Sequence, residues 1–183
     1  MIDYNSLTDT FEAVWSRLTD APTNPASPAR FLALATVGRS GGAEARMIVL
    51  RAADRDQAQL TAFTNAASAK VAELSAMPSA TLLVWDPADS LQIRLRSTVT
   101  QRPATDADWT RLPPRDHALY ARDPLPGTPL DTPTANTPTP DAALFTILTA
   151  RIDEIETLHL GRDLHRRALF RRTDAFRGQW IAP

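Results

Sequence analysis

The stretch ARMIVLRAADRDQAQLTAFTNAASAK, residues 45–70, decides the fold. It predicts a strand bracketed by Arg46 and Arg51, then a polar turn, then a second strand over residues 59–64 that leads directly into the start of a helix. The unit therefore brings side chains from strands and from a helix start together, and we expect the rest of the chain to be arranged around it.

The end of this stretch has the chemistry of a phosphate site. The first N–H groups of a helix lack partners within the helix and attract anions. Thr64, Asn65 and Ser68 add hydroxyls and an amide there, and either Asn65 or Ser68 can cap the helix. Lys70 is the single lysine among twenty Lys and Arg residues, and its compact charge can reach a phosphate where a planar guanidinium does not fit. The residues also leave open a simpler reading, in which Lys70 is a solvated helix residue and Arg46 a strand-edge charge.

The chain before this stretch predicts a helix and a hairpin. Residues 31–37 read as a buried strand, and the glycine-rich turn at residues 38–42 returns the chain as the strand of Arg46. Such a hairpin indicates an antiparallel sheet. Residues 5–20 predict an amphipathic helix that covers the sheet, and the proline-rich residues 21–28 predict a loop. The apolar stripe of the helix consists of Leu7, Phe11, Val14, Trp15 and Leu18.

The chain after this stretch continues with a short helix and two strands. Residues 68–76 predict a helix that ends before Pro78 and faces inward with Val71, Leu74 and Met77. Residues 80–85 predict a strand. Residues 91–100 alternate strictly, so one face of that strand belongs to the core and the other is a row of hydrogen-bond donors. The core face carries Leu91, Ile93 and Leu95, and the donor face carries Gln92, Arg94 and Arg96.

The last third of the chain is richer in proline. Residues 105–122 predict a helix interrupted at Pro113 and Pro114, and residues 123–141 form a Pro/Thr-rich loop that is either disordered or a functional lid. A bent strand is predicted over residues 143–158, and residues 165–172 predict the last strand. Together the elements predict a single, mainly β (α+β) domain over residues 1–183, in which residues 1–28 are the N-terminal helix and loop.

Composition excludes several classes of function. A net charge of −1 gives no bulk attraction to nucleic acid or to an anionic membrane, and no apolar run approaches the length of a membrane span. Without cysteine there is no thiolate chemistry, and the three histidines show no zinc-site spacing, so we expect no metal. Six glycines without a Gly-rich phosphate motif give no support for a dinucleotide site. The polar N-terminus is not a secretory signal, and a cytoplasmic protein is expected.

Several motifs in order resemble the pyridoxamine 5'-phosphate oxidase-like flavoproteins. The segments are Arg46 to Arg51, Phe63 to Lys70, Met77-Pro78, Trp85, Gln92-Ile93-Arg94, Ile155-Glu156, Leu164 to Arg167 and the closing Trp180 to Pro183. The resemblance spans roughly residues 30–100 and 150–183. It implies an antiparallel Greek-key split β-barrel with flanking helices, FMN as cofactor, and an obligate homodimer with FMN at the subunit interface.

The resemblance also implies which residues bind FMN. Arg46 and Lys70 are expected to bind the flavin phosphate with the hydroxyls of Thr64 and Ser68, and Gln92 and Arg167 are expected to reach the flavin from elsewhere on the barrel. Arg167 is expected to act in the partner's site. The complete set of expected cofactor-binding residues is Arg46, Met47, Ile48, Val49, Arg51, Phe63, Thr64, Ser68, Lys70, Gln92 and Arg167.

Substrate recognition departs from the family pattern. Arg51 and His165 match positions that hold the vitamin phosphate in true oxidases, His165 is the candidate catalytic residue, and a further contact could come from Trp109, Arg115 or Tyr120. Asp163, however, stands where the family has an anion-binding arginine, and like charges at about 4 Å cost about 1 kcal/mol even in water. The flanking tryptophan of true oxidases is here Leu158, and the family's mid-chain Gln-Ser pair is replaced by the Pro/Thr-rich loop.

We therefore expect an FMN-dependent oxidoreductase that acts on a small molecule other than pyridoxamine 5'-phosphate. Arg51, Arg115 and His165 are the expected substrate residues. Two alternatives remain open, a flavin-binding module without a substrate of its own and a cofactor-free or haem-binding split barrel. A haem ligand would have to be a histidine, with His165 or His159 as the candidates.

Overall fold

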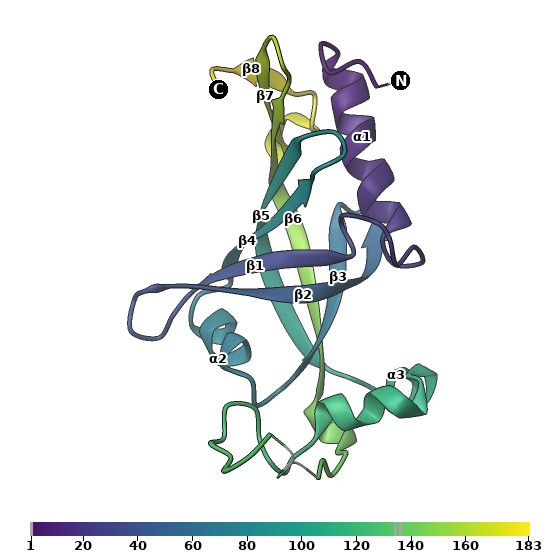
Figure 1. Ribbon diagram of the computed structural model, residues 1–183, viewed down its shortest axis with the longest axis vertical. Coiled ribbons are helices and arrows are strands. Elements are labelled where there is room, and N and C mark those ends of the chain that lie inside the picture. Colours follow the sequence, from purple (N-terminus) through teal and green to yellow (C-terminus); the bar gives the residue numbers. More distant parts are fainter. Residues whose placement is uncertain (1, 134, 136) are drawn as a thin grey trace.

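The computed structural model describes residues 2–133, 135 and 137–183, and its centre is an antiparallel β-barrel (Figure 1). Within these residues the strand order is β3-β2-β1-β4-β5-β6, and β6 pairs back onto β3, which closes a six-stranded barrel. Two further strands, β7 and β8, extend the sheet from β6 beyond the closed part. The mainly β split barrel expected from the sequence is confirmed.

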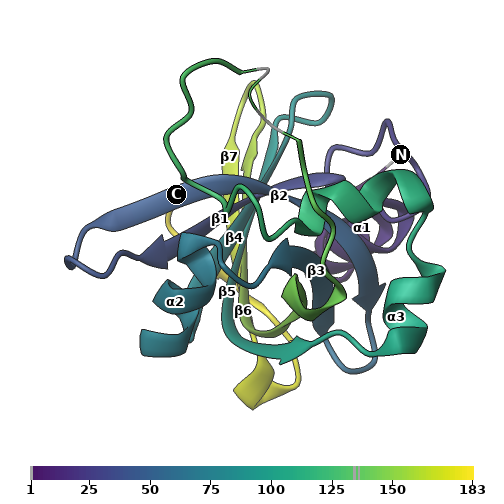
Figure 2. The ribbon, with the colours of Figure 1, turned by 90° about the horizontal axis from the view of Figure 1, so that it is seen from below.

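Helices flank this barrel at both ends. In Figure 1, α1 lies beside the upper part of the sheet, and α2 and α3 lie near its lower end, where Figure 2 shows them on opposite sides. In chain order the elements are α1 (Leu7–Asp20), β1 (Phe31–Val37), β2 (Ala43–Asp54), β3 (Gln59–Asn65), α2 (Ala69–Ala76), β4 (Ser79–Asp86), β5 (Leu91–Pro103), α3 (Asp106–Arg111), the 3-10 helices η1 (Pro114–Tyr120) and η2 (Ala142–Leu144), β6 (Phe145–Leu160), β7 (His165–Arg171), the 3-10 helix η3 (Arg172–Asp174) and β8 (Gln179–Ile181).

The alternation of β5 determines the two faces of the barrel wall. Leu91, Ile93 and Leu95 are fully buried inside, whereas Gln92 lies on the outer face, half-buried and paired with Trp85 of β4. The predicted bend in the long C-terminal strand is a shift in the pairing of β6 with β5, where Arg96 and Ser97 bond to residues that are not consecutive. A shift of this kind lets a long strand bend and serve both the closed barrel and the outer sheet.

The N-terminal helix α1 contributes large apolar side chains to the hydrophobic core. Val14, Trp15 and Leu18 of α1 are buried in the same cluster as Leu32 and Ile93 of the barrel. Helix α1 begins at a Ser6 cap that accepts from the Asp9 backbone N–H. Burial of a large aliphatic or aromatic side chain contributes about 1.5–3 kcal/mol to the free energy of folding, so the packing of α1 contributes substantially to the stability of the fold.

Three expectations about elements are wrong. Met77 does not face inward, because α2 ends at Ala76 and Met77 continues in extended backbone with its side chain 47% exposed. The strand β1 is only half-buried, since its end residues Phe31 and Val37 are exposed. The strand β7 is not the last, because the short β8 pairs with it.

The predicted helix over residues 105–122 is two short helices. Thr105 caps α3 through a capping box with Asp108, and after Pro113 the chain continues as the 3-10 helix η1. This region packs on a second apolar cluster that contains Tyr120 and Phe145. Residues 134 and 136 of the Pro/Thr-rich loop lie outside the described residues. None of the helices in the described part of the chain combines the length and apolar character needed to cross a bilayer.

Candidate functional site

The start of α2 gathers the polar side chains that the sequence placed at a phosphate site. Lys70 Nζ donates to Thr64 Oγ1 at 3.0 Å, and the hydroxyls of Thr64 and Ser68 lie 3.1 Å apart. Ser68 occupies the N-cap position of the helix, while Asn65 Oδ1 accepts from the Ala67 backbone N–H in the preceding turn. Neither side chain makes the expected cap hydrogen bond to α2, and the Ser68 hydroxyl faces Thr64 instead.

Arg46 joins this cluster from the barrel wall. It pairs with the buried Leu34 of β1 and shares a strand face with the buried Ile48 and Leu50, so its side chain leaves the inner face of the wall near the end of the barrel. Its Nη2 donates to Glu73 Oε2 at 2.8 Å. The guanidinium is therefore held at the end of the barrel that α2 covers.

Two cations are close together at this end of the barrel. Burial lowers the pKa of Lys70 from the ordinary value of 10.5, the nearby Arg46 charge lowers it further, and Glu73 partly offsets both effects. A cation buried beside another cation is favourable for an anion that can contact both. The cluster of Arg46, Thr64, Ser68 and Lys70, with the helix start, is therefore a candidate anion site.

Sequence reasoning missed the acidic member of this cluster. Glu73 is 4% exposed and also accepts from Thr36 Oγ1 at 2.6 Å. Its position three residues after Lys70 placed it on the same helix face, which is the signal that could have found it. Thr36 gave no such signal, because a threonine in a β-strand is ordinary.

The remaining residues of the expected flavin set fall in different surroundings. Met47 is 61% exposed on the outer face and Ile48 is buried in the core. Val49 pairs with Phe31 on the outer face. Phe63 packs edge-on against Phe145 at 5.0 Å, in the second apolar cluster.

A second polar group lies on the outer face of the sheet. Gln92 of β5 pairs with Leu158 of β6, which in turn pairs with Arg167 of β7, so Gln92 and Arg167 share one face with a single strand between them. Glu156 is buried and binds two arginines, Arg94 at 2.5 Å through one oxygen and Arg167 at 3.0 Å through the other. This carboxylate fixes the direction of the Arg167 side chain.

The two polar groups lie on opposite faces of the barrel wall. Arg46 shares the inner face with Leu34, whereas Gln92 and Arg167 share the outer face with Trp85. Arg46 is also on β2, which is separated from β5 by β1 and β4. The structure thus brings Arg46 and Lys70 together, and Gln92 and Arg167 together, but it does not bring the two pairs together.

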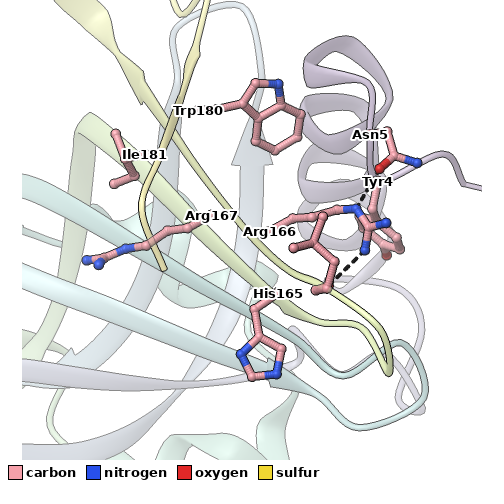
Figure 3. Close-up of a pocket in the computed structure, with 8 residues that line it drawn as sticks. Tyr4, Asn5, His165, Arg166, Arg167, Trp180 and Ile181 are labelled. Atoms are coloured by element: carbon pink, nitrogen blue, oxygen red, sulfur yellow. Dashed lines mark hydrogen bonds between the residues drawn. The ribbon is translucent and has the colours of Figure 1, made fainter.

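The candidate catalytic residue His165 borders a cavity of about 280 Å³ between β7, β8 and the N-terminal segment (Figure 3). Arg166 reaches toward the N-terminus and donates to Asn5 Oδ1 at 2.7 Å, whereas His165 and Arg167 point elsewhere. This alternation follows from the strand geometry of β7. The exposed Trp180 supplies an aromatic wall to the same cavity.

Two expected substrate residues lie apart. Arg51 stands where the pairing of β2 with β3 shifts, and its guanidinium lies 5.6 Å from the centre of the Phe63 ring. Burial raises the pKa of Tyr120, and the Arg51 charge partly offsets that rise, so Tyr120 is near Arg51. The Arg115 side chain is 86% exposed beside Asp116. Of the three open candidates for the additional substrate contact, the structure brings Tyr120 toward Arg51, while Trp109 stacks on His117 at 4.1 Å.

Residues 26–159 match the family model described as "Pyridoxamine 5'-phosphate oxidase". A pyridoxine/pyridoxamine 5'-phosphate oxidase of Thermosynechococcus vestitus is 32% identical over 108 residues, which cover 59% of this chain and 50% of that protein. The chain thus spans about half the length of this curated relative.

Solved structures share the fold over most of the chain. A pyridoxamine 5'-phosphate oxidase-related, FMN binding protein from Nostoc punctiforme superposes with a TM-score of 0.77 at 25% identity, and the match covers 94% of this chain and 96% of that one. PhzG from Burkholderia lata, solved in complex with tetrahydrophenazine-1-carboxylic acid, has a TM-score of 0.72 at 20% identity and covers 95% and 91% of the two chains.

Proposed function

Because the chain belongs to the pyridoxamine 5'-phosphate oxidase family, we propose that it is an FMN-dependent oxidoreductase. The observation that supports this most directly is the pair of cations at the start of α2, where the pKa of Lys70 is lowered by burial and by the charge of Arg46. The phosphate of FMN carries the charge that such a pair attracts. When bound, the flavin itself supplies the hydride-transfer chemistry.

The residues of this chain would bind and orient the cofactor. Arg46 and Lys70 would contact the phosphate through charge-assisted hydrogen bonds of about 1.5–3 kcal/mol each, with hydroxyls from Thr64 and Ser68. The backbone N–H and C=O groups of Ile48 and Val49 would lie along the flavin edge. The Phe63 side chain packs into the second apolar cluster, so its contribution to the site would be to fix the end of β3.

A homodimer would complete the site. Gln92 and Arg167 lie on the opposite face of the wall from Arg46, so in the proposed assembly they belong to the FMN site of the partner. The outer face also exposes a strip of apolar side chains across β2, β1 and β4, which we call the outer strip. It consists of Phe31, Met47, Leu83 and Trp85, which are 55%, 61%, 36% and 47% exposed. An exposed apolar strip of this kind is typical of a protein interface.

The substrate would be a small molecule other than pyridoxamine 5'-phosphate. Asp163 is exposed near the start of β7, and its negative charge would repel the phosphate of pyridoxamine 5'-phosphate. Arg115 is exposed beside Asp116, which reduces its attraction for a phosphate. His165, at the rim of the cavity shown in Figure 3, would orient the donor or accept a proton. Arg51 would supply a charge near Tyr120.

The visible spectrum of the purified protein tests this proposal. We expect flavin absorption, release of FMN rather than FAD on denaturation, and bleaching of the bound flavin by a small-molecule donor under anaerobic conditions. Flavin that no tested donor bleaches would favour the non-catalytic flavin module. A Soret band in place of flavin absorption would contradict the proposal and favour the haem-binding alternative.

The haem-binding alternative has less support from the structure. The apolar interior of the barrel, lined by side chains such as Leu34, Leu60 and Leu82, leaves a cavity of only about 10 Å³. His159 is stacked on Tyr4 at 4.0 Å, with its ring held between the N-terminal segment and the sheet. His165 would remain the histidine available as a ligand.

A further inference from the structure

A closed ring of hydrogen bonds joins Arg46 to a carboxylate. Glu73 Oε2 accepts from Arg46 Nη2 at 2.8 Å and from Thr36 Oγ1 at 2.6 Å, and Thr36 Oγ1 in turn accepts from Arg46 Nη1. Glu73 comes from α2, whereas Arg46 and Thr36 come from the neighbouring strands β2 and β1. Each terminal nitrogen of the guanidinium therefore makes one contact within the ring.

A buried acid in this position needs a physical explanation. Glu73 is 4% exposed, and a buried carboxylate is costly unless it is paired and hydrogen-bonded. If an anion binds to Arg46 and Lys70, the carboxylate also repels that anion. A neutral residue of the same size would fill the space beside the adjacent Leu74 without that repulsion, so packing alone does not explain an acid here, and its contacts with Arg46 and Thr36 must be considered.

The geometry of the guanidinium supplies the explanation. A guanidinium carries five N–H donors in a planar fork, and the ring uses one on each terminal nitrogen of Arg46. Among the residues that the structure describes, the other donors of Arg46 have no hydrogen-bond partner, so they can bind a second acceptor. With its plane fixed by Thr36 and Glu73, Arg46 can hold these donors in one orientation for an anion that also contacts the nearby Lys70.

We propose that Glu73 is a positioning residue for phosphate, which acts by holding Arg46 and does not touch the ligand. This inference rests on the proposed function, since the phosphate is taken to be that of FMN. Fixing a long side chain before binding removes the entropy that the ligand would otherwise have to offset. Glu73 thus strengthens phosphate binding despite its own negative charge, and Thr36 shares the task as the neutral member of the ring.

Two opposite outcomes for one substitution separate this role from simple repulsion. Glu73→Gln removes the negative charge and keeps the side-chain size. If repulsion of the phosphate dominated, the variant would bind FMN more tightly. If positioning dominates, FMN binding weakens by about tenfold, and binding of riboflavin, which lacks the phosphate, stays unchanged.

The experiment measures Kd for FMN and for riboflavin by quenching of flavin fluorescence, in the full-length protein freed of flavin. The variants are Glu73→Gln, Thr36→Val and their combinations with Arg46→Ala. Thr36→Val changes no charge, so a several-fold loss of FMN affinity there can come only from the lost hydroxyl contacts; it also provides a test if Glu73→Gln does not fold. Glu12→Gln is the matched control, because Glu12 pairs with Arg55 at the surface of α1.

We expect both site variants to lower the ratio of FMN to riboflavin affinity, and neither to lower it further once Arg46→Ala is present. Unchanged or tighter FMN binding in both variants would overturn the role of Glu73, as would an equal loss for FMN and riboflavin or a loss that persists with Arg46→Ala. Wild-type protein that does not prefer FMN to riboflavin would overturn the proposed function itself, and the inference with it.

Discussion

Lys70 Nζ donates to Thr64 Oγ1 across 3.0 Å, and this contact ties the only lysine of the chain to the strand that leads into α2. Lys70 is partly buried beside the Arg46 charge, and its pKa is lowered from 10.5 by that burial first and by Arg46 second. The ammonium group of Lys70 is therefore partly removed from water and lies near a second positive charge. It is therefore sensitive both to pH and to the arrival of an anion.

The lowered pKa predicts how FMN binding depends on pH. The affinity for FMN should fall as the pH rises through the lowered pKa of Lys70, at a pH below the 10.5 of an ordinary lysine, because the ammonium then loses its proton. A Kd series for FMN from neutral pH upward measures this. Lys70→Arg should move the fall to higher pH, since arginine stays protonated. A pH-independent Kd in the wild type would contradict the assignment.

The stability of the flavin-free protein should change in the opposite sense. Between the lowered pKa and 10.5, the unfolded chain binds more protons at Lys70 than the folded chain does. The contribution of Lys70 to the free energy of unfolding should therefore rise with pH across that window. Urea unfolding of the wild type and of Lys70→Gln at several pH values isolates this contribution, and an equal pH dependence in both would argue against it.

The carboxylate of Glu156 should be important for stability. It is buried and binds both Arg94 and Arg167, so Glu156→Gln leaves two arginines without their anion. Because both arginine side chains are partly exposed, we expect a loss of about 1–3 kcal/mol in the free energy of unfolding, less than for a fully buried pair. Urea unfolding measures it.

Glu154→Gln is the control for that substitution. Glu154 lies on the same strand and contacts Arg96 and Arg171 at 3.7 and 3.3 Å, and these arginines are more exposed. We expect a loss below about 1 kcal/mol, as for surface pairs. Equal losses for the two variants would show that Glu156 has no special role.

The outer strip should control assembly. Met47→Glu places a charge on a 61% exposed side chain of the outer strip, within the proposed dimer interface, and we expect the dimer to dissociate at micromolar concentration. Analytical ultracentrifugation measures the assembly. FMN affinity should fall with it, because Gln92 and Arg167 would no longer reach the partner's site. Leu119→Glu, at a 60% exposed position on η1, is the control; a monomeric wild type that binds FMN tightly would refute the shared site.

Turnover of pyridoxamine 5'-phosphate should be poor. Asp163 is exposed where a phosphate would approach His165, and replacing it by arginine converts a repulsion into an attraction. In steady-state assays of the FMN-loaded protein, Asp163→Arg should raise kcat/KM for this substrate by about tenfold or more, mainly through KM. Efficient turnover by the wild type would show that Asp163 does not oppose the phosphate.

Local patterns predicted most of the fold and the polar cluster at the start of α2. The alternation of β5 gave the inner and outer faces, because a strand places successive side chains on opposite sides whatever it packs against. Arg46, Thr64 and Lys70 lie within one strand, turn, strand and helix unit, so short-range geometry was enough to suggest their proximity. The order of the motifs also suggested the closed barrel.

The contacts that could not be predicted depend on how elements pack. The pairing of Arg46 with Glu73 requires the rotation of α2 over the barrel end, which its eight residues do not specify. Met77 was expected to face inward because the helical period was extended beyond Ala76, where the helix ends. The strand β8 is only three residues long, too short for a recognisable alternation.

The most direct test of the central claim is the affinity for FMN relative to riboflavin in the wild type and in the double variant Arg46→Ala, Lys70→Ala. Two charge-assisted contacts of about 1.5–3 kcal/mol each predict that the wild type prefers FMN by at least about a hundredfold, and that the double variant loses nearly all of this preference while its riboflavin affinity stays the same. A double variant that still prefers FMN as strongly as the wild type would show that the phosphate binds elsewhere.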